Sequence, residues 1–298
     1  MGRNQLDVTI LLPCYNEEKA LSAVVKDIRN AMKESRHSYE ILVVDDRSTD
    51  NSANIAESLG CRVIRHSVKL GAGAARKTGM LSALGSIIVM LDADGSYSSK
   101  DIPKMLELFP EYDQVNGART SEKGAFSWLR SPAKWIIRIL ASFLAGRMIP
   151  DLNTGLKAFK RDIMLQYLWT IPDGFSCVSS MTLAFLCNGH PVAYIPTEYH
   201  KRIGKSKFHP IKDTYAYILT ILRLITYFNP LRIFFPMALL FLIAGILKSL
   251  YDYFFVLRRL QLSDIILIIT GVVIGLQGLL ADLIVAQART RSVSAYKD

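Results

Sequence analysis

The chain has 298 residues, half of them hydrophobic, which is enough for one large α/β domain and a smaller second part. The formal net charge of +10 predicts an anionic partner, which could be nucleic acid, a membrane surface or a phosphorylated substrate. Four scattered cysteines with no CxxC pair favour the reduced, buried thiols of a cytosolic domain, and Asp7 interrupts the first apolar stretch too early for a signal peptide.

Strand-like and helix-like segments alternate from residue 7 to residue 118. Helices are expected at residues 18–33, 72–84 and 101–109, where apolar residues recur at helical spacing or follow a capping residue. Strands are expected at residues 7–13, 39–46, 61–66, 86–92 and 112–119. These strands are continuous apolar runs, which is typical of a mainly parallel sheet buried on both faces. The predicted class is a Rossmann-like α/β domain built from βαβ units.

Acidic and small polar residues follow four of these strands. The segments are PCYNEE after the first strand, DDRSTD after the second, DADGS after the fourth and GAR after the fifth. Ligands of open α/β sheets bind beyond the carboxyl ends of the strands. The sequence therefore predicts a site at this edge of the sheet.

Asp92 and Asp94 follow a buried strand and lie two positions apart, so both carboxylates point the same way in an extended chain. Two like charges at that spacing repel each other unless a cation lies between or beside them. Mg²⁺ and Mn²⁺ prefer oxygen ligands and often keep positions open for phosphate oxygens. The pair is expected to hold Mg²⁺ or Mn²⁺, which in turn binds a diphosphate. The alternative is that the two residues only cap the following turn.

The segment LGAGAARKTG, residues 70–79, departs from the dinucleotide-binding pattern. Arg76 stands at the third glycine position, and the segment follows the third strand rather than the first. Gly71 and Gly73 would let the backbone approach a nucleotide, with Arg76 near its phosphates. An ordinary helix start explains the same glycines equally well.

Two long apolar segments, residues 233–255 and 264–286, lie in the C-terminal third. Each is long enough to cross a hydrocarbon core, and the short link between them predicts a transmembrane hairpin within residues 231–288. Lys248 and Asp282 would lie near an interface and snorkel, and Lys248 is one helical turn from a partner, Asp252.

Charge around the hairpin predicts its orientation. Basic residues in the tail, 289–298, and in the domain at 1–209 place both in the cytosol, although Arg258 and Arg259 in the link weigh mildly the other way. Residues 128–148 and 210–229 mix apolar, aromatic and basic residues, as helices in a membrane interface do; an amphipathic core helix is the alternative.

Four basic residues are candidates for binding a phosphate: Arg119, Arg130, Arg202 and Lys205. Arginine binds phosphate through a bidentate fork and lysine as a point charge. Each alone is typical of a solvated surface, but as a set they lie between the sheet edge and the proposed membrane plane. Because the positive charge gathers there and not on an aromatic-studded face, we expect no nucleic-acid partner.

The motifs ILLPCYNEE, ILVVDDRSTDNS, GAGAARKTGM and MLDADGSYSSKDIPKML resemble, in this order, those of family 2 glycosyltransferases with the GT-A fold. DLNTGLKAF (151–159), RIGKSKF (202–208) and the hairpin narrow the resemblance to polyprenyl-phosphate glycosyltransferases. That group contains dolichyl-phosphate mannose synthases and bacterial undecaprenyl-phosphate glucosyltransferases. The resemblance covers nearly the whole chain.

The resemblance implies a role for each matching position. Asp92 and Asp94 would be the metal-binding motif, and Asp46 would bond to the edge of the nucleotide base. The pocket for that base would be formed by Pro13, Tyr15, Asn16 and Glu17.

The resemblance also implies the reaction, an inverting transfer of one sugar from a nucleotide diphospho-sugar to undecaprenyl or dolichyl phosphate at the cytosolic face of a prokaryotic plasma membrane. UDP-glucose and GDP-mannose are the candidate donors; Ser179 and Ser180, where mannose synthases often carry an acid, favour the bacterial branch. A phosphate dianion is already a nucleophile and needs positioning rather than a general base.

Two alternatives stay open: a transferase that acts on a saccharide or lipid hydroxyl, and a non-catalytic membrane scaffold. A homo-oligomer is compatible with the sequence.

Overall fold

The computed structural model describes residues 6–120, 148–174, 176–200, 202–203, 226–256 and 259–294, with a few isolated positions between these ranges. The chain divides into two compact units, Met1–Ile221 and Leu222–Asp298. Most residues of the predicted interfacial helices at 128–148 and 210–229 lie outside the described residues, so these two helices stay predictions.

A seven-stranded sheet, in the order β3-β2-β1-β4-β6-β5-β7, forms the first unit. The strands are β1 (Val8–Cys14), β2 (Tyr39–Asp45), β3 (Arg62–Arg65), β4 (Ile87–Met90), β5 (Gln114–Arg119), β6 (Lys157–Lys160) and β7 (Val192–Thr197). All neighbours are parallel except β6, which runs antiparallel to both β4 and β5. The five predicted strands and the mainly parallel sheet are confirmed.

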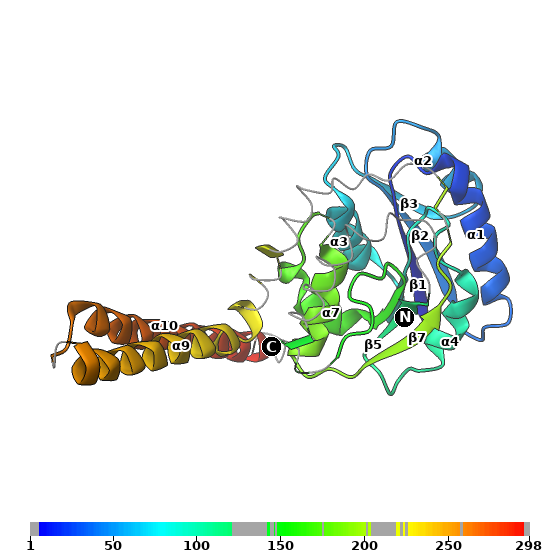
Figure 1. The fold of residues 1–298 in the computed structure, drawn as a ribbon. Coiled ribbons are helices and arrows are strands. Elements are labelled where there is room, and N and C mark those ends of the chain that lie inside the picture. Colours follow the sequence, from blue (N-terminus) through cyan, green and yellow to red (C-terminus); the bar gives the residue numbers. More distant parts are fainter. Residues whose placement is uncertain are drawn as a thin grey trace. The chain divides into compact units, whose positions relative to one another are not determined.

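Helices cover both faces of this sheet, with α1 and α4 on one face and α3 and α7 on the other (Figure 1). Among the residues that the structure describes in this unit, the helical elements are α1 (Glu18–Met32), α2 (Ser52–Ser58), α3 (Ala72–Ser82), η1 (Ser99–Asp101), α4 (Ile102–Leu106), α6 (Arg161–Gln166), η2 (Leu168–Thr170) and α7 (Cys177–Cys187). The apolar face of α1 predicted from helical spacing is buried against the strands. The central strands β1, β2 and β4 are mostly buried beneath these helices, as their continuous apolar sequences predict.

Strand β6 places a distant segment beside the carboxyl end of β4. Its first residue, Lys157, is paired with Met90, so the chain just before β6 passes next to Asp92. Gly155 permits this approach, because a Cβ there would lie 2.5 Å from Oδ2 of Asp92. The predicted motif at residues 151–159 is thus part of the same sheet edge.

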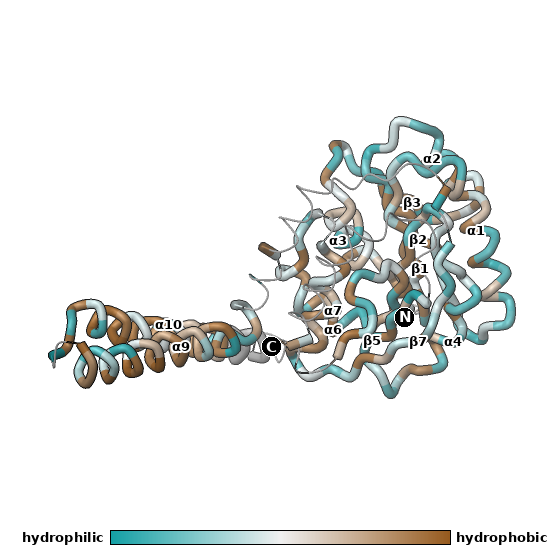
Figure 2. The backbone as a smooth tube through the Cα atoms, viewed as in Figure 1, coloured by the Kyte–Doolittle hydropathy of each residue, from teal (hydrophilic) through white to brown (hydrophobic). Residues whose placement is uncertain are grey.

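The second unit contains α9 (Leu231–Tyr251), a π-helical turn (Asp252–Val256) and α10 (Leu262–Ser294). Residues 231–256 and 262–287 are each long and apolar enough to cross a membrane, with a mean hydropathy of 2.2 (Figure 2). The two helices pack closely, since a Cβ on Gly271 would lie 2.9 Å from the backbone nitrogen of Leu242. The predicted pair of helices is confirmed.

Lys248 joins the two helices of this unit. Its Nζ lies 2.6 Å from Asp252, as predicted, and also 2.7 Å from Asp264 and 2.9 Å from the hydroxyl of Ser263 at the start of α10. Lys248 thus belongs to an ion-pair cluster between the helices, and its snorkelling to a membrane interface stays a prediction.

Candidate functional site

Loops that follow β1, β2 and β4 meet at one edge of the sheet, because these three strands are parallel neighbours. The loop after β1 is tied to the loop after β2: the backbone nitrogens of Asn16 and Glu17 donate to the hydroxyls of Ser48 and Ser52, at 2.9 and 2.8 Å. The Asn16 side chain also accepts from the backbone nitrogen of Thr49. The predicted base-pocket segment after Pro13 is thus held rigidly by hydrogen bonds.

Tyr15 is the half-buried aromatic residue of this loop. The Nζ of Lys69 lies 3.7 Å from the centroid of its ring, a cation–π contact. One face of the tyrosine predicted to stack on a nucleotide base is therefore covered by a lysine that the sequence reasoning did not single out.

Asp46 is buried and accepts three hydrogen bonds, each of 2.8 Å. The donors are the backbone nitrogens of Leu70 and Gly71 and, through its Nδ1, the ring of His66. Asp46 thus fixes the loop that leads into α3. The predicted hydrogen bond between Asp46 and the edge of the nucleotide base would add to these contacts.

The glycines at the start of α3 make room for protein backbone. A Cβ on Gly71, whose φ is +108°, would lie 2.6 Å from the carbonyl oxygen of Asp173, and a Cβ on Gly73 would collide with the carbonyl oxygen of Pro172. The backbone nitrogen of Gly73 donates to Asp173 across this contact, at 2.8 Å. In this structure the close approach predicted for a nucleotide is made by residues 172–173.

Arg76, on the buried side of α3, is paired with Asp92. Its Nη2 donates to Oδ1 of Asp92 at 2.6 Å, and its Nη1 donates to the sulfur of buried Cys177 at 3.1 Å. Burial raises the pKa of Asp92, an effect opposed by Arg76 and reinforced by the charge of Asp94. The arginine predicted to lie near nucleotide phosphates is thus held on the first aspartate of the pair.

Asp94 is more deeply buried than Asp92 and has both oxygens engaged. Its Oδ1 accepts from the backbone nitrogen and the hydroxyl of Ser96, at 3.0 and 2.5 Å. Its Oδ2 accepts from Arg202, with a distance of 2.8 Å to Nε and a shorter contact to Nη2. The structure therefore brings Asp92, Asp94, Arg76 and Arg202 together, as two ion pairs side by side.

The donor set at this point suits a hard divalent cation. Asp92 and Asp94 offer carboxylate oxygens, the ligands that Mg²⁺ and Mn²⁺ prefer, and phosphate oxygens or water can complete the coordination. In the part of the chain that the structure describes, no third His, Cys, Asp or Glu joins them. A cation here would thus depend on the ligand for its remaining contacts.

Arg119 forms a bidentate pair with Asp151. Its Nε and Nη2 lie 2.7 and 2.9 Å from the two carboxylate oxygens, and its guanidinium carbon lies 5.3 Å from the ring centroid of Tyr199. The neighbouring guanidinium lowers the pKa of Asp151 against the effect of burial. The other two residues of the predicted phosphate-binding set, Arg130 and Lys205, lie outside the described residues.

Lys157 was missed by the sequence reasoning. It is fully buried, and its Nζ donates to Asn116 at 3.1 Å and to Thr182 at 2.6 Å. Burial lowers the pKa of this ammonium to about 7. The available signal was a lysine within the apolar run LKAF, where a buried strand is expected to carry no charge.

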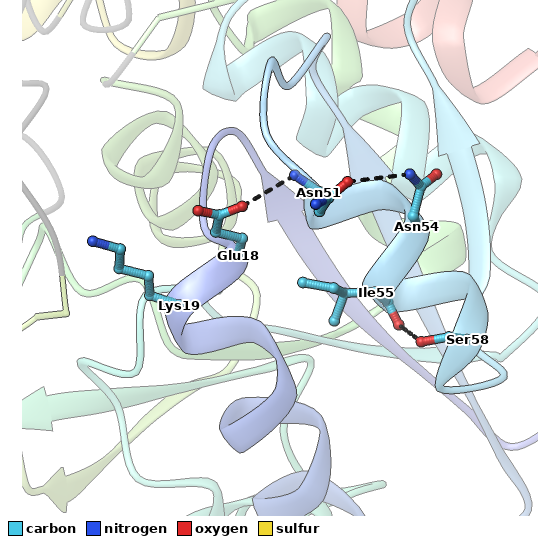
Figure 3. A pocket seen from close by; sticks show the side chains of 6 residues that line it. All are labelled: Glu18, Lys19, Asn51, Asn54, Ile55 and Ser58. Carbon is cyan, nitrogen blue, oxygen red and sulfur yellow. Dashed lines mark hydrogen bonds between the residues drawn. The ribbon is translucent and has the colours of Figure 1, made fainter.

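An open pocket of about 540 Å³ lies between α1 and α2 (Figure 3). It is lined by Glu18, Lys19, Asn51, Asn54, Ile55 and Ser58. None of the predicted site residues lines it, and Glu18 accepts a hydrogen bond from the backbone nitrogen of Asn51 beside it (Figure 3). The pocket is therefore distinct from the site at the ends of the strands.

Comparison with known proteins gives two family matches. Residues 9–172 match the family described as glycosyl transferase family 2, and residues 229–286 match the GtrB C-terminal hairpin. The chain is 30% identical to glycosyltransferase AglJ of Haloferax volcanii over 95% of each chain. It is 32% identical to the dolichyl-phosphate hexose transferase of the same organism over 68% of this chain and 87% of the relative.

A solved structure shares the fold of the first unit. Glucosyl-3-phosphoglycerate synthase from Mycobacterium tuberculosis, in complex with Mn²⁺, UDP-glucose and phosphoglyceric acid, matches with a TM-score of 0.58 and 17% identity. The match covers 74% of this chain and 80% of that chain. Together with the family matches, it confirms the GT-A class predicted from the sequence.

Proposed function

The chain belongs to glycosyl transferase family 2, and on that premise we propose that it moves one sugar from a nucleotide diphospho-sugar to a polyprenyl phosphate in a membrane. The observation that carries this proposal is the Asp92–Asp94 pair with its two arginines at the carboxyl edge of the sheet. Arginine donors and a divalent cation held by carboxylates both bind the oxygens of a diphosphate. The similarity to a dolichyl-phosphate hexose transferase supports a lipid phosphate as the acceptor.

The cation, the nucleotide base and the phosphates are assigned to three sets of residues. Asp92 and Asp94 would hold Mg²⁺ or Mn²⁺, and a cation bound there would stabilise negative charge on the diphosphate of the donor. Pro13, Tyr15, Asn16 and Glu17 surround the base of the donor. Arg202 and Arg119, with Arg130 and Lys205, bind the phosphates.

The acceptor needs orientation rather than deprotonation. A phosphate monoester is mostly a dianion at neutral pH, since its second pKa is near 6. Attack by its oxygen on the anomeric carbon, opposite the departing diphosphate, inverts that carbon. Holding the two reactants in line accounts for the rate increase without a general base.

The second unit anchors the protein in the membrane that contains the acceptor. Its two helices are long and apolar enough to span a bilayer, and the hairpin match supports that reading. We place the first unit in the cytosol of a prokaryote, where UDP-glucose or GDP-mannose is available as the donor.

The test is a transfer assay with purified full-length protein, Mg²⁺ or Mn²⁺, a panel of labelled nucleotide sugars and undecaprenyl or dolichyl phosphate. We expect label in the lipid extract with one donor. Asp94→Asn removes a proposed metal ligand and should lower the rate by a factor of 100 or more, which corresponds to a rise of about 2.7 kcal/mol in the activation free energy. The variant should stay folded.

Asp282→Asn, on α10 and remote in sequence from the sheet edge, is the matched control and should keep full activity. Undiminished transfer by Asp94→Asn, or transfer in the presence of a strong chelator, would contradict the metal assignment.

A further inference from the structure

Two arginines neutralise the aspartate pair, and they differ sharply in exposure. The side chain of Arg76 is 7% exposed, whereas that of Arg202 is 36% exposed. An arginine that leaves a carboxylate must regain its lost contacts from water or from another anion. Only Arg202 is placed to do so.

Arg76 is fixed on Asp92 by its surroundings. It is buried in α3 and bonded at the same time to Asp92 and to the sulfur of Cys177. Withdrawing it would leave an unpaired charge inside the protein, which costs several kcal/mol in general. We therefore regard the Arg76–Asp92 pair as permanent.

Arg202 reaches Asp94 from a segment that runs along the loop after β4. Tyr199 forms a β-bridge with Tyr97. The backbone nitrogens of His200 and Ile203 donate to the backbone carbonyl oxygens of Ser96 and Asp94, at 2.8 and 3.0 Å. The guanidinium then occupies Oδ2 of Asp94, the oxygen that Ser96 leaves open. Of the two oxygens of Asp94, only this one does not accept from Ser96, so it is the one that we assign to a cation.

From these contacts we propose that Arg202 and the divalent cation compete for Oδ2 of Asp94. With Arg202 in place, the two aspartates and two arginines carry no net charge, so the site has little attraction for a cation. When the cation takes Oδ2, the half-exposed guanidinium is released and becomes available to the phosphate oxygens that arrive with it. The inference rests on the proposed function, whose cation and diphosphate it uses.

Arg202 is thereby paired with the carboxylate of Asp94 when no donor is bound. When the donor and its cation bind, Arg202 leaves that carboxylate. A neighbouring arginine lowers the affinity of a carboxylate for a proton by about 10- to 1,000-fold. For a larger, hydrated cation we take the lower end of that range and expect an effect of about tenfold.

The test is the binding of Mn²⁺ alone to the full-length protein, followed by electron paramagnetic resonance of the free ion. Arg202→Ala should bind Mn²⁺ about tenfold more tightly than the wild type, and Arg202→Lys should lie between them because it keeps the charge but loses the fork. Arg62→Ala is the matched control: Arg62 is 37% exposed and paired with Glu40 at the opposite edge of the sheet. It removes the same charge and should leave Mn²⁺ affinity unchanged.

Adding Asp94→Asn to Arg202→Ala should abolish the gain. Equal or weaker Mn²⁺ binding by Arg202→Ala, in protein whose thermal unfolding is still cooperative, would overturn the competition. That result would leave the proposed function standing if the wild type still transfers sugar to polyprenyl phosphate. If Arg202→Ala binds Mn²⁺ more tightly but the wild type transfers no sugar, the competition stands and only the proposed function is overturned.

Discussion

Lys157 is a charged group held inside the sheet by two neutral partners, Asn116 and Thr182. Its pKa of about 7 in the folded protein lies below the 10.5 of an exposed lysine. Below pH 7 the ammonium is protonated in both the folded and the unfolded protein, so burying its charge lowers the free energy of unfolding by the full amount. As the pH rises from 7 towards 10.5, the unfolded chain binds more protons than the native one, so the stability rises.

Lys157→Met removes this dependence on pH. We expect the free energy of unfolding of the wild type to rise relative to that of the variant by about 1.4 kcal/mol per pH unit above pH 7. The measurement is thermal unfolding of both proteins in detergent at pH 7, 8 and 9. A constant difference between them over that range would mean that Lys157 does not lose a proton there.

Gly73 tests the contact between α3 and residues 172–173. A Cβ at this position would collide with the carbonyl oxygen of Pro172 and lie 2.7 Å from the carbonyl carbon of Asp173, both backbone atoms. Gly73→Ala should therefore destabilise the protein by about 1–3 kcal/mol, as overpacking does. Gly174→Ala is the control, since nothing lies within 4 Å of its Cβ; equal unfolding midpoints for the two variants would contradict the contact.

For individual residues of the site, the sequence predicted which carboxylates matter but not which side chains pair with them. Asp92 and Asp94 were found because two carboxylates at the end of an apolar run are a local signal. Their arginine partners are 16 and 108 residues away, so only the fold brings each of them to its aspartate. The same holds for Asp151, whose pairing with Arg119 joins positions 32 residues apart.

Among the elements, β6 and β7 show what periodicity does not reveal. The five strands in βαβ units were predicted because apolar runs alternate with amphipathic helices. β6 has only four residues, and buried Lys157 interrupts its apolar character. β7 is only half-buried along most of its length and contains Pro196, so it lacks the pattern of an interior strand.

The helices of the second unit are joined by the cluster of Lys248, Asp252 and Asp264. Asp252 and Asp264 are buried, and the ammonium of Lys248 lies within 2.6 and 2.7 Å of their carboxylates. Lys248→Met should lower the thermal stability of the protein in detergent, because it leaves two carboxylates without a counter-charge. Changing both aspartates to asparagine in that background should restore part of the loss.

Arg259, exposed in the connection between the same helices, is the matched control for this cluster. Arg259→Met removes an equal charge and should leave the midpoint of thermal unfolding unchanged. Equal midpoints for Lys248→Met and the wild type would show that the cluster contributes nothing to the hairpin.

For the whole molecule, each of the two units matches a different family model. The first has the fold and the acidic sheet edge of a family 2 glycosyltransferase, and the second has a hairpin that is long and apolar enough for a membrane. Both units were predicted from the sequence, because a parallel sheet and a pair of apolar helices are patterns of many residues. The identity of the sugar depends on a few side chains and was not predictable in the same way.

The most direct test of the account offers the protein equal amounts of a polyprenyl phosphate and the corresponding polyprenol, with Mn²⁺ and the donor that gives product. We expect almost all of the sugar on the polyprenyl phosphate, because its phosphate dianion is a nucleophile without a general base and the hydroxyl of the polyprenol is not. Glycosylation of the alcohol at an equal rate would contradict it and would favour a transferase that acts on hydroxyl groups.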